Sequence, residues 1–140
     1  MKRLSLPIAM VLGLILVTPT FGATTAFTGE WIGTDPAPPD GDGSTVHLYV
    51  TGGTHAKLTL TDEFGTVCVL AESEETFFTS TLVGVVSGDT LDATIVAARC
   101  GTVPLKFLQG SSLSFELDDQ GNANPADDTL SDGSVDWQRV

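Results

Sequence analysis

Residues 76–100, TFFTSTLVGVVSGDTLDATIVAARC, hold two runs of alternating apolar and polar side chains on either side of Gly88 and Asp89. A period of two is typical of a strand with one buried face, and a Gly-Asp pair between two such runs is typical of a hairpin turn. The stretch therefore predicts two antiparallel strands, over 76–87 and 90–100. On the second strand, the alternation predicts an inward-facing row made of Leu91, Ala93, Ile95, Ala97 and Arg99.

Short runs of the same kind continue through the rest of the chain, separated by Gly, Asp, Asn and Pro. No window after residue 24 repeats apolar side chains at helical spacing over three turns. Turn signals about every ten residues are typical of an all-β domain. The other expected strands are 27–34, 44–51, 55–61, 66–72, 103–108, 112–118 and 135–140, and 119–133 is expected to be a loop.

The predicted fold is a small antiparallel up-and-down β-barrel of about eight strands. Strands that have one dry face and are joined by hairpins form antiparallel sheets. Closing such a sheet on itself removes its exposed edges, which favours a barrel. A two-sheet β-sandwich is the alternative, and the pattern leaves open whether the barrel interior is filled or hollow.

The first 23 residues have the layout of a secretory signal peptide. Lys2 and Arg3 precede an apolar run over 4–17, and small or turn-forming residues follow, with a cleavage site after Gly22 or Ala23. The run is shorter than the roughly 20 residues that a membrane-spanning helix needs. We therefore expect a signal peptide over 1–23, a single domain over 24–140, and a secreted protein, extracellular or periplasmic.

The net charge limits which classes of partner the protein can bind, and the cysteine content bears on the redox state of its compartment. The formal net charge is −12, which excludes nucleic acid and anionic membrane surfaces as partners because both repel an acidic protein. The chain holds two cysteines, Cys68 and Cys100. In an oxidising compartment, a lone pair of cysteines predicts one disulfide.

Both ends of the predicted domain resemble the calycins, the superfamily of lipocalins, avidins and certain bacterial protease inhibitors. Gly29-Glu30-Trp31 opens the first expected strand and is similar to the Gly-x-Trp of those barrels. The run 28–31, followed by Gly43-Ser44-Thr45, is similar to the first hairpin of avidin-like proteins. The resemblance implies that Arg139, in the last strand, packs over Trp31 and closes the barrel, with Trp137 beside it. A guanidinium stacks well on an indole face while its N–H groups bind carbonyl oxygens.

The aromatic pocket of avidins has no counterpart here, so the resemblance implies neither biotin nor a named lipophile. The large aromatic side chains with a polar group are Trp31, Trp137 and Tyr49. Tyr49 is a candidate ligand contact on that ground. Arg99 is another, because on an inward row it would cap the barrel mouth or bind a ligand carboxylate.

A calcium loop is the one cofactor site that the sequence suggests. Asp40, Asp42 and Ser44 place oxygen donors at alternate positions. The EF-hand pattern needs Gly at its sixth position and Glu at its twelfth, where this chain has Thr45 and Thr51. A turn made of turn-forming residues is the alternative, and no other cofactor is expected.

Catalytic signals are weak. His47 and His55 flank the predicted Gly52-Gly53 turn and are expected on opposite faces of the hairpin, and no nucleophile motif is present in the sequence. We therefore expect a secreted, non-enzymatic binding module for a small apolar ligand or an exported protein. A protease-inhibitor-like barrel acting through the segment 24–26 is one alternative, and a structural or surface protein is another.

Overall fold

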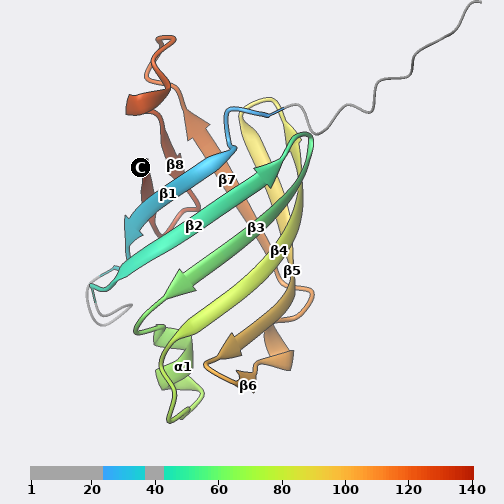
Figure 1. The fold of residues 1–140 in the computed structure, drawn as a ribbon, viewed down its shortest axis with the longest axis vertical. Helices are drawn as coiled ribbons and strands as arrows, with labels where there is room; N and C mark the ends of the chain where they lie inside the picture. Colours follow the sequence, from blue (N-terminus) through green and yellow to red (C-terminus); the bar gives the residue numbers. More distant parts are fainter. Residues whose placement is uncertain (1–23, 37–42) are drawn as a thin grey trace, which may run out of the picture.

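The computed structural model describes residues 24–36 and 43–140. Within them the chain forms one nine-stranded sheet with three short helices (Figure 1). The strands are β1 (Gly29–Thr34), β2 (Thr45–Gly52), β3 (His55–Asp62), β4 (Phe78–Ser87), β5 (Thr90–Cys100), β6 (Val103–Pro104), β7 (Ser112–Asp118), β8 (Thr129–Ser131) and β9 (Asp136–Arg139). The helices are α1 (Thr66–Leu70), η1 (Lys106–Leu108) and η2 (Pro125–Asp127).

The sheet closes on itself. Its strands follow the order β4-β3-β2-β1-β9-β8-β7-β5, and β5 also pairs with β4, so eight antiparallel strands form a continuous barrel. The first and last strands are neighbours, with Trp31 opposite Arg139 and Gly33 opposite Trp137. The short strand β6 extends only the end of β5. The predicted barrel is therefore confirmed, and the sandwich alternative is wrong.

Alternation along the strands directs the apolar rows inward and fills the middle of the barrel. The large apolar side chains that are 0% exposed include Trp31, Leu48, Leu58, Leu82, Leu91 and Phe115. An eight-stranded barrel has an interior just wide enough for its own side chains. Each fully buried side chain of this size contributes roughly 1.5–3 kcal/mol to folding. The middle of the barrel is therefore a packed core.

The predicted inward row of β5 is wrong beyond Ile95. The pairing with β4 shifts at this point, because Leu82 pairs with Ile95 while Thr81 pairs with Ala97. The extra residue is a β-bulge, and one extra residue exchanges the two faces of all that follows. Ala97 and Arg99 therefore lie on the outer face, while Ala98 and Cys100 are buried.

Three other elements differ from the sequence prediction. The expected strand 66–72 is instead the helix α1 and a turn, because the chain leaves the barrel after β3 and has no neighbouring strand there. The expected strand 103–108 is reduced to β6 and η1, since Pro104 has no N–H to continue a ladder. The expected loop 119–133 contains β8, which places the buried Leu130 between β7 and β9.

The two ends of the barrel are built from different parts of the chain. One end, which we call the arginine end, holds the segment 24–28, the β2–β3 and β4–β5 hairpins, η2 and Arg139. The other, which we call the disulfide end, holds α1 and β6, at the bottom of Figure 1. No helix in the described part of the chain is long and apolar enough to cross a membrane.

Candidate functional site

A pocket of about 190 Å³ opens at the disulfide end. Pockets that hold drug-sized ligands have volumes of roughly 300–1,000 Å³, so this one suits a smaller ligand. An apolar pocket with a few convergent polar groups is the usual form of a ligand site. The apolar lining is Val46, Leu60, Val67, Phe78, Val135 and Trp137, and the other lining residues are Asp35, Asp62, Gly65, Thr66 and Asp132.

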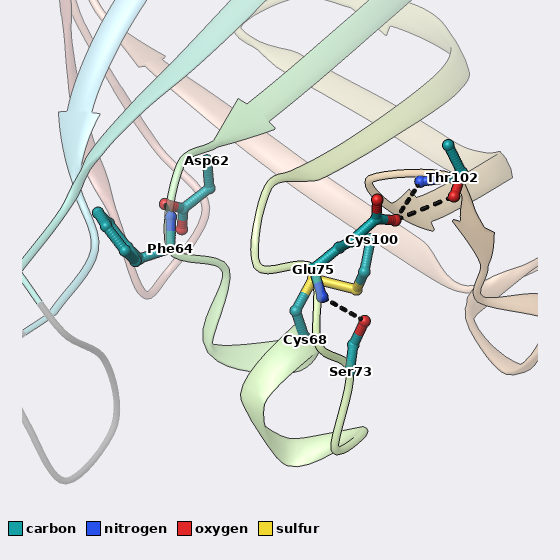
Figure 2. The surroundings of a disulfide bond; sticks show 7 residues. All are labelled: Asp62, Phe64, Cys68, Ser73, Glu75, Cys100 and Thr102. Atoms are coloured by element: carbon teal, nitrogen blue, oxygen red, sulfur yellow. Dashed lines mark hydrogen bonds between the residues drawn. A yellow bond between two sulfur atoms is a disulfide. The ribbon is translucent and has the colours of Figure 1, made fainter.

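Asp62 is a carboxylate on the inner face of the barrel. It continues the inward row of β3, after Ala56, Leu58 and Leu60, and is only 6% exposed. Its Oδ1 accepts hydrogen bonds from Ser44 Oγ at 2.6 Å and from the backbone N–H of Phe64 at 3.0 Å. Its Oδ2 has no hydrogen-bond partner among the described residues. Figure 2 shows this carboxylate where the chain leaves β3, beside Phe64.

Trp137 presents the second unusual polar group of the pocket. Its side chain is 1% exposed, and its indole N–H, buried, has no partner among the residues that the structure describes. The indole N–H of Trp31, by contrast, donates to the backbone oxygen of Phe27 at 2.9 Å. Buried donors in folded proteins almost always have an acceptor, so the Trp137 N–H calls for one.

The other two carboxylates of the pocket are engaged with its walls. Asp35 Oδ2 accepts from Thr66 Oγ1 at 2.9 Å. Asp132 Oδ1 accepts from the backbone N–H groups of Ser134 at 2.9 Å and Val135 at 2.7 Å. Both side chains remain hydrogen-bond acceptors, so the polar part of the pocket is acidic.

A disulfide holds one wall of the pocket. Cys68 in α1 and Cys100 at the end of β5 are bonded, with their Cα atoms 5.7 Å apart, which confirms the predicted pair (Figure 2). A five-residue helix is far too short to be stable alone. The bond therefore anchors α1 against the barrel, and with it the pocket residues Thr66 and Val67.

Gly65 brings this wall close to the barrel. A Cβ atom at this position would lie 2.5 Å from Phe78 Cβ, closer than two carbon atoms can approach without a shift.

The loop after α1 is bound to the barrel by hydrogen bonds of its own. Glu75 Oε2 accepts from the backbone N–H of Thr102 at 2.6 Å and from its hydroxyl at 3.0 Å (Figure 2).

The arginine end is held together by the side chain of Arg139. The guanidinium carbon of Arg139 lies 4.1 Å from the centre of the Trp31 ring. Its N–H groups donate to Thr28 O at 3.0 Å, to Pro125 O at 2.8 Å, to Ala26 O and to the Asp128 carboxylate at 3.3 Å. Trp137, grouped with Arg139 by the sequence, lies toward the disulfide end instead, opposite Gly33, and lines the pocket.

The segment 24–28 is packed against this end. Phe27 is 1% exposed, and the backbone N–H of Thr28 donates to Thr25 O at 3.1 Å. Arg139 holds the carbonyl of Ala26. This part of the chain is thus tied to the barrel, which does not favour the alternative of a free inhibitory tail.

The remaining candidate residues lie outside the pocket. Arg99 and Tyr49 are on the outer face. His47 and His55 are both on that face too, so the prediction of opposite faces is wrong. Gly52 pairs with Ala56, so three residues, 53–55, connect the paired positions instead of the two expected, and this odd change brings His55 onto the same face as His47.

Tyr49 belongs to a small polar cluster on the outer face. It is 41% exposed and stacks on the His47 ring, with centroids 6.2 Å apart. His47 Nδ1 is 3.4 Å from Glu30 Oε1. Desolvation, followed by the hydrogen bond and negative charge of Glu30, raises the pKa of the Tyr49 hydroxyl above 10.0.

Asp40 and Asp42 of the suggested calcium loop lie outside the described residues, while the Ser44 hydroxyl donates to Asp62. Among residues 24–36 and 43–140, no group of three or more His, Cys, Asp or Glu side chains is placed to hold a metal ion.

Sequence reasoning missed Asp62. The signal was present, because the alternation through Ala56, Leu58 and Leu60 continues to position 62 and predicts an inward carboxylate. In comparisons with known proteins, no family model, curated protein or solved structure matches this chain.

Proposed function

We propose that this protein is a secreted, non-enzymatic binding barrel of the calycin type, which holds a small apolar ligand at its disulfide end. The observation that carries the proposal is the pocket itself, which has an apolar lining and a few convergent polar groups. The packed middle of the barrel limits a ligand to this end and to small size.

Three features support the calycin assignment. The barrel has eight antiparallel strands in a closed ring. Gly29-Glu30-Trp31 opens its first strand, and Arg139 of the last strand stacks on the Trp31 ring. This is the arrangement that the resemblance implies, although a shared fold does not by itself define a ligand.

Export is supported by the layout of residues 1–23, which lie outside the described residues. The Cys68–Cys100 disulfide is compatible with an extracellular or periplasmic location. A binding role without catalysis is supported by the position of His47 and His55, which lie on the outer face, away from the pocket.

The test is a titration of the ¹⁵N-labelled protein with 2-phenylethanol, a small, neutral, largely apolar probe. We expect saturable shifts of the Trp137 indole N–H and of the backbone amides of Val46 and Val67. A ligand of this size binds with a Kd on the order of millimolar, because the binding energy per atom is limited.

A matched pair of variants locates the site. Val67→Phe fills the pocket and is expected to weaken 2-phenylethanol at least tenfold, while Val69→Phe, on the same helix but exposed and not part of the lining, leaves its affinity unchanged. Equal affinity for both variants, or no saturable shift of the pocket resonances in the parent protein, would refute the proposal.

A further inference from the structure

The outer face of the barrel becomes apolar over one part of β4. The outward side chains of this strand change from Thr79 and Thr81 to Val83 and Val85, and both valines are 48% exposed. A single exposed apolar side chain on a protein surface is ordinary. Two successive valines on the outward face of one strand are instead the start of a patch, and exposed apolar patches mark surfaces that bind a partner.

The sequences of β4 and β5 lose their alternation at this point. Residues 82–86 of β4 read LVGVV, and residues 95–98 of β5 read IVAA, so apolar residues occupy both faces. A strand with one wet face alternates, whereas a strand covered on both faces reads as a continuous apolar run. In the single chain, however, Val83, Val85 and Val96 remain exposed. This outer surface, which we call the valine face, therefore has the composition of a covered one.

Side chains of opposite charge border the valine face. On β3, Lys57 lies opposite Val83 and His55 lies opposite Val85, and both are exposed. On β5, the exposed Asp92 lies opposite Val85 on its other side. Side chains directly opposite one another on the same face of an antiparallel pair have Cβ atoms roughly 4.5–5.5 Å apart. Three neighbouring strands thus present a basic border, an apolar centre and an acidic border.

The valine face is also recessed. A groove of about 520 Å³ follows these three strands, and its lining includes His55, Lys57, Val83, Val85 and Asp92. None of the residues that line this groove lines the pocket at the disulfide end. The valine face is therefore a second surface feature, independent of the proposed ligand site.

The order basic, apolar, acidic is complementary to itself. A two-fold axis parallel to β4, between two facing copies, places β3 of each copy over β5 of the other and β4 over β4. Interfaces of this kind use the same patch on both subunits. An acidic or a basic partner, by contrast, would meet a like charge at one border. We propose that this protein forms a two-fold dimer through the valine face, with Lys57 of each copy against Asp92 of the other.

The formal net charge of −12 does not prevent this contact at physiological salt. At 0.15 M ionic strength the Debye length is about 8 Å, so charges far from the interface are screened from one another. Opposite charges brought together at the interface still attract. Because the valine face is small, the dimer is reversible rather than permanent.

Sedimentation velocity at neutral pH and about 0.15 M salt measures the association. For the purified parent protein we expect a monomer–dimer equilibrium with a Kd on the order of 10–100 μM. Val83→Thr combined with Val85→Thr continues the threonine row of β4 and is expected to raise the Kd about tenfold or more. Val69→Thr is the matched control, because Val69 is an exposed valine of α1, and it leaves the Kd unchanged.

Charge reversal tests the two-fold arrangement. Lys57→Glu places two acids at both contacts and Asp92→Lys places two bases there, so each variant alone is expected to remain monomeric. An equimolar mixture of the two variants has opposite charges at both contacts and is expected to dimerise with a Kd within about threefold of the parent value. Lys106→Glu is the control for the change of charge, because Lys106 is exposed on η1, outside the valine face, and it leaves the Kd unchanged.

Three results would overturn the proposal, provided that circular dichroism shows the variants to be folded. A parent protein that stays monomeric up to about 1 mM would assign the valine face to a different partner. Dimerisation that survives the valine substitutions would place the interface elsewhere on the barrel. If the mixture of charge variants stays monomeric, the two-fold arrangement is wrong.

Discussion

The arginine end and the disulfide end close the same barrel in different ways. At the arginine end, the Arg139 side chain stacks on Trp31 and donates to three backbone carbonyls and the Asp128 carboxylate. At the disulfide end, a covalent bond anchors a five-residue helix beside a pocket that Trp137 lines, and the buried indole N–H of Trp137 has no partner among the described residues.

This difference separates stability from recognition. Polar groups that bind one another inside the protein contribute to the folded state and have little left to offer a ligand. Polar groups left unpaired in a buried place cost free energy unless a ligand or water satisfies them. At the arginine end, the N–H groups of Arg139 are therefore taken up by contacts within the protein, and the disulfide end is where we propose that a ligand binds. The buried Thr25 hydroxyl is the one unpaired side-chain atom of this kind recorded at the arginine end of the described chain.

Among the variants that test this difference between the two ends, the one without the disulfide is expected to lose the most unfolding free energy. The double variant Cys68→Ala with Cys100→Ala is expected to lower the free energy of unfolding by about 3–4 kcal/mol, since the bond closes a loop between residues 32 positions apart. Denaturant unfolding measures the loss.

Amide hydrogen exchange shows which parts of the double cysteine variant lose protection. The amides of Cys68 and Ala71, which are bonded to Gly65 O and Val67 O, are expected to lose protection, while the amide of Val140, bonded to Glu30 O, retains it. Equal loosening of both ends would contradict the division between them.

Replacing the arginine is expected to have the next largest effect. Arg139→Met leaves the buried Asp128 carboxylate without its cation and is expected to cost about 3 kcal/mol of unfolding free energy. Arg139→Lys restores the charge but not the stacking or the several carbonyl contacts, so we expect only a partial recovery.

Arg99→Met is the control for this variant, because Arg99 is exposed on the outer face of β5. It is expected to change the unfolding free energy by less than about 0.5 kcal/mol. As long as Arg139→Met remains folded, its pocket is expected to bind 2-phenylethanol with unchanged affinity. Loss of that affinity would show that the two ends are not independent.

The smallest expected change is a shift of the pKa of Tyr49, which lies on the outer face and belongs to neither end. Tyr49 is the single tyrosine of the chain, so ultraviolet absorbance follows its ionisation alone. Glu30→Gln is expected to lower the Tyr49 pKa toward 10.0, because it removes the negative charge that disfavours the phenolate.

The raised pKa of Tyr49 also makes its contribution to stability depend on pH. Since the folded protein holds this proton more tightly than the unfolded chain, the contribution is present below pH 10 and is lost as the pH rises through the folded pKa. The disulfide and Arg139 variants should leave the Tyr49 titration unchanged while folded. A changed Tyr49 pKa in either variant would show that the outer face is coupled to the ends of the barrel.

The sequence predicted the features that depend on local pattern. Alternation identified the long strands β2 to β5 and β7, and with them the barrel. The lone cysteine pair identified the disulfide. The calycin resemblance, rather than local pattern, implied that Arg139 packs over Trp31, and Arg139 does lie over its ring.

The errors arose where a neighbouring strand decides the outcome. Whether Arg99 faces in or out depends on a bulge that is defined only by the pairing of β5 with β4. Thr66–Leu70 contains β-branched residues typical of a strand, yet it has no strand to pair with and is helical. The three-residue β8 exists because β7 and β9 lie on either side of it.

The pairing of β1 with β9 also sets when the barrel can be completed. The chain is synthesised from its N-terminus, and Arg139 lies 111 positions beyond Thr28, whose carbonyl it binds. Until β9 has paired, β1 and β8 have open backbone edges, which are templates for association with other chains. The species most prone to such association is therefore the chain in which β9 has not yet paired.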